Sequence, residues 1–82
     1  MDASKHYIYI VECKDGTFYT GYTTNVKRRV EEHNSGVGAK YTRGRYPVKL
    51  RHQEVFSSRS QAQKREYQIK QLPREKKEEL FN

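Results

Sequence analysis

Residues 7–23 decide the fold, and they read YIYIVECKDGTFYTGYT. Both ends of this stretch, residues 7–13 and 17–23, are rich in the β-branched and aromatic side chains that favour strands. Between them lies Lys14-Asp15-Gly16, which is typical of a tight turn. The stretch therefore predicts a β-hairpin.

Two turns fit this hairpin, and they give different registers. A two-residue turn at Asp15-Gly16 places Tyr9 and Tyr19 on opposite faces, whereas a three-residue loop with a left-handed Gly16 places them on one face. In the second register the other face carries Ile8, Ile10, Phe18 and Tyr22. We predict the second register, because it gives the core one apolar face and leaves the two phenols together on a polar face.

A short helix and a loop are expected after the hairpin. Thr24-Asn25 can cap a helix over residues 26–34, where Val26 and Val30 lie one turn apart. Residues 35–46 contain three glycines and three cations, a composition typical of a surface loop.

A third strand is predicted over residues 48–56. Pro47 precedes it, and a proline at the start of a strand suits the edge of a sheet. One side of this strand is expected to carry Val48, Leu50, His52 and Phe56.

Two helices complete the chain. Ser58 begins a capping box, and a helix then continues until Pro73, which cannot extend it. A last short helix is predicted over residues 74–80. The order ββαβαα indicates an α+β domain, a three-stranded sheet flanked by helices, that occupies residues 1–82 as a single domain.

The chain has 82 residues, and its 17 Lys and Arg exceed its 10 Asp and Glu by seven. Such an excess of positive charge favours an anionic partner. The single cysteine, Cys13, excludes an internal disulfide and a thiolate zinc cluster, and no apolar run approaches the ~20 residues of a membrane span. We expect a cytoplasmic protein that does not bind membranes.

Glu66 stands on an otherwise apolar helical stripe formed by Ala62, Ile69 and Leu72. A carboxylate that points toward a sheet needs a cation, because its burial is otherwise costly. Two partners fit. One is Lys70, a helical turn away, and the other is a Mg²⁺ ion held by one carboxylate, water and phosphate oxygens.

Arg29 and His33 lie one turn apart on the same predicted helix. Arg29 could lie over the hairpin face that bears Tyr9 and Tyr19, where its guanidinium would hold phosphate oxygens and stabilise developing charge. His33 could move protons, although a solvated charged face is the alternative interpretation of this pair. A tyrosine is a poor base unless a cation lowers its pKa, and we expect Arg29 and a cation on Glu66 to do so.

A cluster of cations around an aromatic ring favours nucleic acid as the partner. The cluster comprises Lys27, Arg28, Lys40, Tyr41, Arg43 and Arg45. The cations would contact the phosphate backbone while a base stacks on Tyr41, whereas the alternative is a charged surface that serves solubility.

Several of these residues form an ordered series, Tyr7-Ile8-Tyr9, Tyr19-Thr20-Gly21, Arg29, His33-Asn34-Ser35-Gly36 and Glu66. In order and spacing the series resembles the GIY-YIG nuclease domain, over residues 7–72. Residues 38–45 and 64–66 are similar to the small stand-alone bacterial members of that family, whose cellular role is poorly defined. Tyr7 and Thr20 replace the Gly and Ile of the family name, and both tyrosines of the paired motifs remain.

The resemblance implies a three-stranded sheet flanked by helices and metal-dependent hydrolysis of phosphodiester bonds. It implies that Tyr9 and Tyr19 are the paired tyrosines, Arg29 the catalytic arginine, His33 an accessory histidine, and Glu66 the ligand of Mg²⁺ or Mn²⁺. The expected protein is an endonuclease that acts on DNA rather than RNA, on branched or damaged DNA in repair or recombination, with a protein partner that could supply specificity. The alternative is a noncatalytic nucleic-acid-binding module on the same scaffold.

Overall fold

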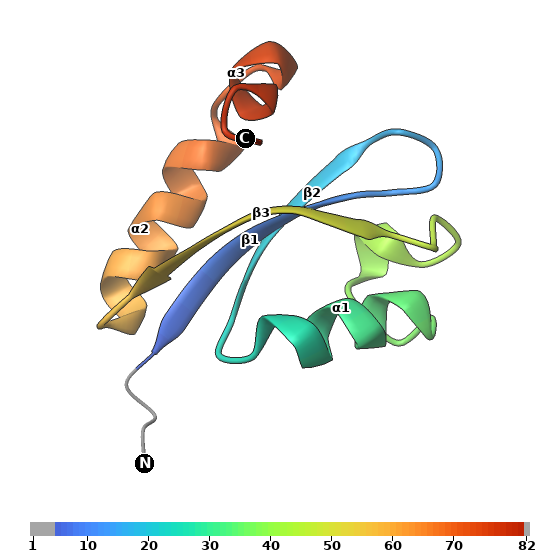
Figure 1. Ribbon diagram of the computed structural model, residues 1–82, viewed down its shortest axis with the longest axis horizontal. Helices are drawn as coiled ribbons and strands as arrows, with labels where there is room; N and C mark the ends of the chain where they lie inside the picture. The colour runs from blue at the N-terminus through green and yellow to red at the C-terminus, as the bar shows by residue number, and fades with distance from the viewer. Residues whose placement is uncertain (1–4, 82) are drawn as a thin grey trace.

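The computed structural model describes residues 5–81 and contains one antiparallel sheet of three strands (Figure 1). β1 (His6–Glu12) lies in the centre, between β2 (Phe18–Thr23) and β3 (Lys49–Phe56). β1 and β2 form the predicted hairpin, and β3 is an edge strand, as Pro47 indicated. The α+β class and the order ββαβαα are confirmed.

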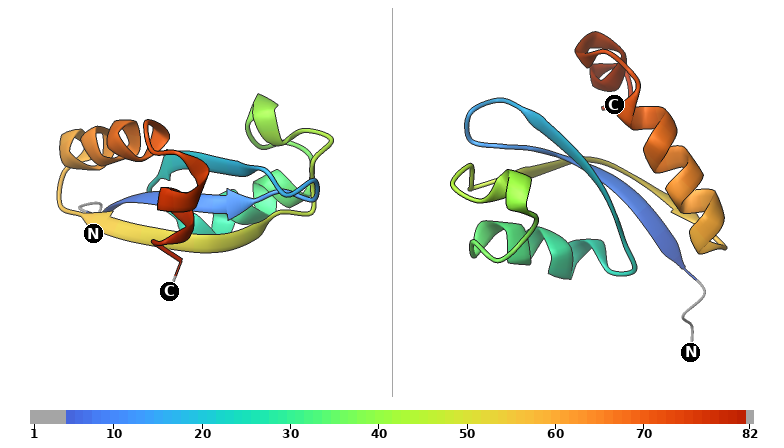
Figure 2. Two further views of the ribbon diagram at one scale, coloured as in Figure 1. Left: turned by 90° about the horizontal axis from the view of Figure 1, so that it is seen from above. Right: turned by 180° about the vertical axis from the view of Figure 1, so that it is seen from behind.

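Helices cover both faces of the sheet (Figures 1 and 2). α1 (Val26–Asn34) packs on one face, and α2 (Arg59–Lys70) packs on the other and is followed by α3 (Arg74–Glu78). A short 3-10 helix, η1 (Lys40–Thr42), interrupts the segment over residues 35–46 that the sequence predicts as a loop. Within the described residues, no helix is long and apolar enough to cross a membrane.

Side-chain caps begin the two longer helices where the sequence predicts them. The side chain of Asn25 accepts a hydrogen bond from the backbone N–H of Arg28 at 3.0 Å, and that of Ser58 accepts one from Gln61 at 3.2 Å. Each cap satisfies a backbone donor that the first helical turn leaves unpaired. α3 ends at Glu78, slightly before its predicted boundary.

The hairpin adopts the register of the three-residue loop. Tyr9 pairs with Gly21, Val11 pairs with Tyr19, and Gly16 has a φ of +86°. This left-handed conformation is open to glycine at little steric cost. Tyr9 and Tyr19 therefore lie on the same face of the hairpin, as predicted.

Both faces of the sheet are buried, which differs from the prediction of one apolar and one polar face. The core on the α1 side consists of Tyr9, Val11, Cys13, Val26 and Val48. The core on the α2 side consists of Ile8, Ile10, Ala62 and Ile69. Because α1 packs over the tyrosine face, the side chain of Tyr9 lies within a core and is only 1% exposed.

A bulge in β3 divides its side chains between the two faces. The pairing of β1 with β3 shifts by one residue at Arg51, which has no partner on β1. Leu50 lies with Val48 on the α1 side, whereas His52 and Phe56 lie on the α2 side. The prediction that these four residues share one side is wrong, because one inserted residue reverses the alternation of a strand.

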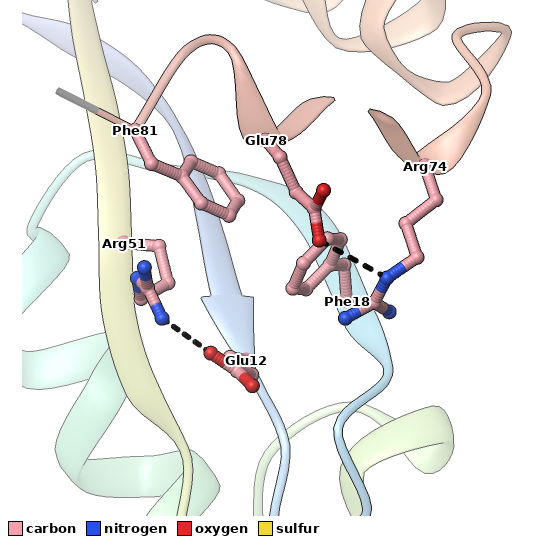
Figure 3. Close-up of a pocket in the computed structure, with 6 residues that line it drawn as sticks. All are labelled: Glu12, Phe18, Arg51, Arg74, Glu78 and Phe81. Carbon is pink, nitrogen blue, oxygen red and sulfur yellow. Dashed lines mark hydrogen bonds and ion pairs between the residues drawn. The ribbon is translucent and has the colours of Figure 1, made fainter. Parts of the chain in front are cut away.

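The C-terminal segment docks on the hairpin through alternating aromatic and charged side chains (Figure 3). Phe18 and Phe81 pack edge to face with ring centroids 5.1 Å apart. Arg74 lies 4.0 Å from the Phe18 centroid, and Arg51 lies 4.9 Å from the Phe81 centroid. A hollow of about 320 Å³ beside them is lined by Glu12, Phe18, Arg51, Arg74, Glu78 and Phe81. Each arginine pairs with one of the two carboxylates, so we assign the hollow to the packing of α3.

Candidate active site

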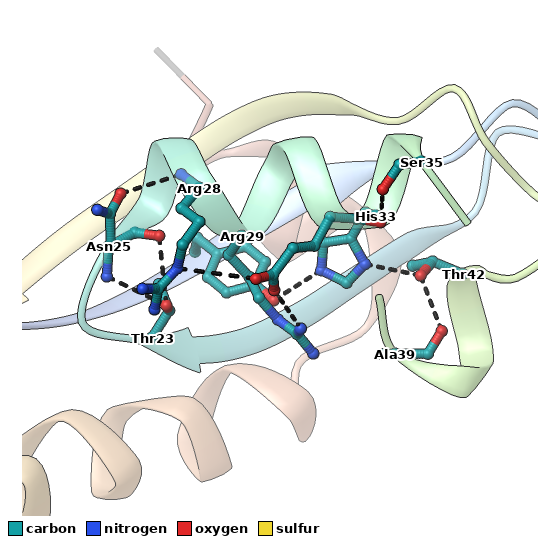
Figure 4. A network of polar contacts seen from close by, with 10 residues as sticks. Thr23, Asn25, Arg28, Arg29, His33, Ser35, Ala39 and Thr42 are labelled. Carbon is teal, nitrogen blue, oxygen red and sulfur yellow. Dashed lines mark hydrogen bonds and ion pairs between the residues drawn. The ribbon is translucent and has the colours of Figure 1, made fainter. Parts of the chain in front are cut away.

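His33 lies at the centre of a buried hydrogen-bonded chain that joins three elements (Figure 4). Its Nε2 is 2.9 Å from the hydroxyl of Tyr9 on β1, and its Nδ1 is 2.7 Å from Oγ1 of Thr42 on η1. His33 and Thr42 are fully buried. The fold therefore brings together three polar side chains from segments that are far apart in the sequence.

Tyr19 extends this site toward the surface. Its ring centroid lies 6.3 Å from that of Tyr9 and 5.5 Å from that of His33, and its ring stacks on Tyr41 with centroids 5.7 Å apart. The guanidinium of Arg45 lies 4.4 Å from the centroid of Tyr41. These contacts form a column, called the aromatic column below, that leads from the buried histidine to the basic segment around η1. It consists of the rings of His33, Tyr19 and Tyr41 and the guanidinium of Arg45.

Two glycines allow these side chains to approach the backbone closely. A Cβ atom at Gly21 would lie 2.5 Å from the hydroxyl oxygen of Tyr9. A Cβ atom at Gly38 would collide with the imidazole of His33 and lie 2.7 Å from its Cα. Because packed atoms do not approach one another this closely, only glycine fits at either position without displacing Tyr9 or His33.

Arg29 lies on α1 beside the Tyr9 hydroxyl. Its guanidinium donates a hydrogen bond to Glu32 at 2.8 Å, and its side chain remains 30% exposed. The hydrogen bond with Glu32 raises the pKa of Arg29, and the neighbouring Tyr9 raises it further, so the guanidinium stays charged. A charged, planar and partly exposed group next to the phenol is suited to hold phosphate oxygens.

Burial raises the pKa of Tyr9 to about 12, although the adjacent Arg29 opposes the rise. Arg29 lowers the pKa of this tyrosine as predicted, but burial outweighs it, so the predicted net lowering is wrong for the protein without a cation on Glu66. Removing the phenolate from water costs more than the attraction of one cation returns. Tyr9 is consequently protonated at neutral pH, and it can accept a proton only while it passes its own proton on.

Burial lowers the pKa of His33, and the positive charge of Arg29 lowers it further. His33 is therefore neutral at pH 7, and a neutral imidazole has one nitrogen with a free lone pair. That lone pair can accept a proton. The site thus pairs a protonated phenol with a neutral imidazole at hydrogen-bond distance.

The lowered pKa of His33 predicts that the protein loses stability as the pH falls below about 6.5. In the window between the pKa of folded His33 and the ordinary value of 6.5, the unfolded chain binds more protons than the folded protein. The free energy of unfolding therefore rises with pH across this window. The groups that face His33 are Arg29 and Glu32 on α1, Tyr9 on β1 and Tyr19 on β2.

Urea unfolding between about pH 7.5 and about pH 5.5 would test this loss of stability. NMR titration of the His33 ring would test its cause. A midpoint above the ordinary histidine value would contradict the prediction.

Glu66 lies on α2, and its carboxylate pairs with Lys70 at 3.0 Å. Lys70 is thus one of the two partners that the sequence offers for Glu66. The side chain of Glu66 is 19% exposed, and its charge is near enough to Tyr9 to add a small increase to the pKa of that phenol. Among residues 5–81, no group of three or more His, Cys, Asp or Glu could hold a metal ion. A single carboxylate fits Mg²⁺ or Mn²⁺ that keeps its water, rather than a metal that needs several protein ligands.

Four of the predicted nucleic-acid-binding residues lie at the outer end of the aromatic column, namely Lys40, Tyr41, Arg43 and Arg45. Arg45 also pairs with Asp15 at 2.8 Å. The ring of Tyr41 is 40% exposed, and it already contacts Tyr19 and Arg45. A base would therefore stack on this assembly rather than on a bare ring.

The other two predicted nucleic-acid-binding residues, Lys27 and Arg28, lie on α1 and face different ways. Arg28 shares Glu32 with Arg29, at a distance of 3.7 Å between Nε and the carboxylate. Lys27 lies toward β3, where it lines a groove with Leu50. The structure thus places Arg28 beside Arg29 and Lys27 away from the aromatic column.

The sequence does not indicate Thr42 or Gly38 as site residues. Both fall in the segment over residues 35–46, whose composition indicates an exposed loop, and Thr42 is nevertheless fully buried. The available signal lies in the residue types, since a glycine and a small hydroxyl side chain follow closely on a helix whose last turn carries His33. Only the tertiary structure shows that both contact that histidine.

The sheet carries a tyrosine on each hairpin strand, and Arg29 and His33 lie on the helix that covers it. The model of the GIY-YIG catalytic domain matches residues 5–79, and the chain belongs to this family. Nucleases with this domain typically use a divalent metal ion and act on nucleic acid.

Close relatives of the chain are UPF0213 proteins, a small stand-alone family of unknown role. A UPF0213 protein of Halobacterium salinarum is 67% identical over 76 residues, which cover 93% of this chain and 99% of the relative. One from Staphylococcus haemolyticus is 60% identical over 74 residues, 90% of each chain. The solution NMR structure of a UPF0213 protein from Bacillus halodurans is 56% identical, with a TM-score of 0.59, and the match covers 93% of this chain and 81% of that chain. The family that the motifs resemble is thus confirmed.

Proposed function

We propose that this protein is an endonuclease that uses a divalent metal ion to hydrolyse phosphodiester bonds in DNA. The observation that carries the proposal is the contact between the Tyr9 hydroxyl and His33 Nε2 beside the charged Arg29. A module that only bound nucleic acid would need cations alone. Hydrolysis also needs a proton acceptor, and here one stands next to the cation.

Tyr9 and His33 act together as the general base. As a water molecule attacks phosphorus, its proton passes to the Tyr9 oxygen while the Tyr9 proton passes to His33 Nε2. The bond from phosphorus to the leaving oxygen breaks, and that oxygen takes a proton from solvent. The proton on His33 then returns through Tyr9 to solvent, which restores the neutral imidazole. The high pKa of Tyr9 does not hinder the exchange, because no free phenolate forms.

Arg29 binds the reacting phosphate. Its guanidinium can hold two phosphate oxygens and stabilise the negative charge that grows on them during attack. Glu32 orients it through the hydrogen bond at 2.8 Å, and the partial exposure of the side chain leaves it open to a substrate. Tyr19 lies against the rings of Tyr9 and His33, and it maintains the packing of the pair.

Glu66 would hold the Mg²⁺ or Mn²⁺ ion through its carboxylate. When bound, the ion would supply positive charge that polarises the reacting phosphate. Lys70, which now neutralises Glu66, is 49% exposed, so it can move into solvent when another cation takes its place.

DNA would lie across the outer end of the aromatic column. Lys40, Arg43 and Arg45 would contact its phosphates, Arg28 would extend this surface along α1, and a base would stack near Tyr41. Branched or damaged DNA in repair or recombination is the proposed substrate, with a protein partner to supply specificity.

A cleavage panel tests the proposed function. Purified protein with Mg²⁺ is incubated with branched, nicked, duplex and single-stranded DNA and with RNA, and cleavage is followed on gels. Glu66→Gln keeps the shape of the side chain but removes its charge, and it should lower cleavage by at least about 100-fold. Lys70→Gln is the matched control, because it breaks the same ion pair and leaves the carboxylate in place.

Two results would overturn the proposal. Cleavage that survives Glu66→Gln would exclude Glu66 as the metal ligand. If the wild-type protein cleaves no substrate but binds DNA with an affinity that falls steeply with salt, the domain is a noncatalytic binding module.

A further inference from the structure

We infer that Thr42 is a positioning residue that fixes the tautomer of His33, with the proton on Nδ1 and the lone pair on Nε2. The inference concerns the same site as the proposed function, and its catalytic consequence rests on that function. The tautomer itself is a property of the folded protein, which can be measured without any substrate.

The direction of the hydrogen-bonded chain follows from its last member. Oγ1 of Thr42 lies 2.9 Å from the carbonyl oxygen of Ala39, and a carbonyl oxygen can only accept. The single hydroxyl proton of Thr42 is therefore donated to Ala39. Oγ1 can then only accept from His33 Nδ1, which lies 2.7 Å away and must carry the imidazole proton.

The other side of the ring follows from charge and from the proton count. His33 is neutral, because burial and the charge of Arg29 oppose its protonation, so Nδ1–H leaves Nε2 with a free lone pair. The Tyr9 hydroxyl, 2.9 Å from Nε2, is then the donor in that hydrogen bond. Each proton in the chain points from β1 toward the carbonyl of Ala39.

Among residues 5–81, Thr42 is the hydrogen-bond partner of His33 Nδ1. Both side chains are fully buried, so water does not reach the contact. Gly38 lies so close to Nδ1 that even a Cβ atom would collide with the ring. The 3-10 turn fixes the acceptor as well, because the carbonyl of Ala39 also accepts the backbone N–H of Thr42 at 3.0 Å.

The opposite tautomer would disable the proposed proton path. With the proton on Nε2, His33 would donate a hydrogen bond to the Tyr9 oxygen. That bond would occupy the lone pair of the Tyr9 oxygen that should accept the proton of the attacking water. The phenolic proton would have no acceptor on His33. The hydroxyl of Thr42 therefore keeps the imidazole in the form that can receive a proton from Tyr9.

Nitrogen NMR of the metal-free, full-length protein tests the inference. In ¹⁵N-labelled wild type, long-range ¹H–¹⁵N spectra should show a protonated Nδ1 and an unprotonated Nε2 in His33. Thr42→Val, which replaces the hydroxyl by a methyl group, should populate the tautomer with Nε2 protonated, and Thr42→Ser should restore the wild-type pattern.

A matched control comes from Thr20, which is also buried but whose Oγ1 makes no hydrogen bond to any of the described residues. Thr20→Val should leave the His33 spectrum unchanged. In the cleavage assay, Thr42→Val should lower kcat by about 10- to 100-fold with little change in KM, and Thr42→Ser should recover most of it.

A wild-type His33 protonated on Nε2, or a tautomer that Thr42→Val leaves unchanged, would overturn the inference. If Thr42→Val does not fold, the tautomer of His33 is measured in the wild type and in Thr42→Ala, which also removes the hydroxyl. A wild-type protein that shows the Nδ1–H tautomer and its loss in the variant, but cleaves nothing, would support the inference and refute only the proposed function.

Discussion

Replacing Arg29 by alanine is expected to lower kcat for DNA cleavage by about 10²- to 10³-fold, the usual effect of removing one fixed group that stabilises transition-state charge. The folded protein should remain, because the side chain of Arg29 is 30% exposed and its ion pair with Glu32 spans only one helical turn. The loss should appear in kcat more than in KM, since the charge on the phosphate grows during attack.

Arg65→Ala is the matched control for this variant. Arg65 is also helical, its side chain is 31% exposed, and it pairs with a glutamate, Glu54, at 2.9 Å. Arg65→Ala removes an ion pair with two hydrogen bonds that joins α2 to β3 on the other side of the sheet, so it should cost at least as much stability as Arg29→Ala. Arg29→Lys should recover little activity, because an ammonium group cannot hold two phosphate oxygens in one plane. Equal losses for Arg29→Ala and Arg65→Ala would show that Arg29 acts only through stability.

Tyr9→Phe is expected to reduce cleavage by about 10²- to 10⁴-fold, the range that a general base contributes. Tyr19→Phe should cost much less. The sequence treats the two tyrosines as equivalent candidates, but the structure distinguishes them. The hydroxyl of Tyr9 meets His33 Nε2 at 2.9 Å, whereas Tyr19 contacts the same imidazole through its ring, with centroids 5.5 Å apart.

Tyr9→Phe should also destabilise the fold by about 1–3 kcal/mol, because it leaves a buried nitrogen of His33 without its partner. Urea unfolding measures this cost, and the kinetics are compared where each variant is fully folded. Tyr67→Phe, at a side chain 68% exposed on α2, should change neither property. If Tyr19→Phe is the more damaging of the two site variants, the proton path through Tyr9 and His33 is wrong.

Much of the fold could be predicted because its signals are local. Lys14-Asp15-Gly16 sets the loop, and the loop sets which side chains share a face, so the pairing of Tyr9 with Gly21 followed from a few neighbouring residues. The helix starts were predictable for the same reason, since Asn25 and Ser58 cap the helices with hydrogen bonds that span three residues.

For the candidate site, the sequence could predict several residues that belong to it but not their protonation states. Tyr9, Arg29 and His33 could be selected from spacing and from the family resemblance, and the structure brings all three together. Their protonation states could not be predicted, because these depend on how much water the surrounding chain removes. The burial that α1 imposes on Tyr9 reverses the expected direction of its pKa shift.

The sequence by itself determined the hairpin, its register, the starts of the two longer helices and the identity of the tyrosine, arginine and glutamate candidates. The tertiary structure alone decided that the tyrosine face is buried, that the bulge at Arg51 sends Leu50 and His52 to opposite faces, and that Thr42 contacts His33. The physical reason is range. Turns and caps are hydrogen bonds between near neighbours, whereas burial and proton direction are set by atoms that only the completed packing brings into contact.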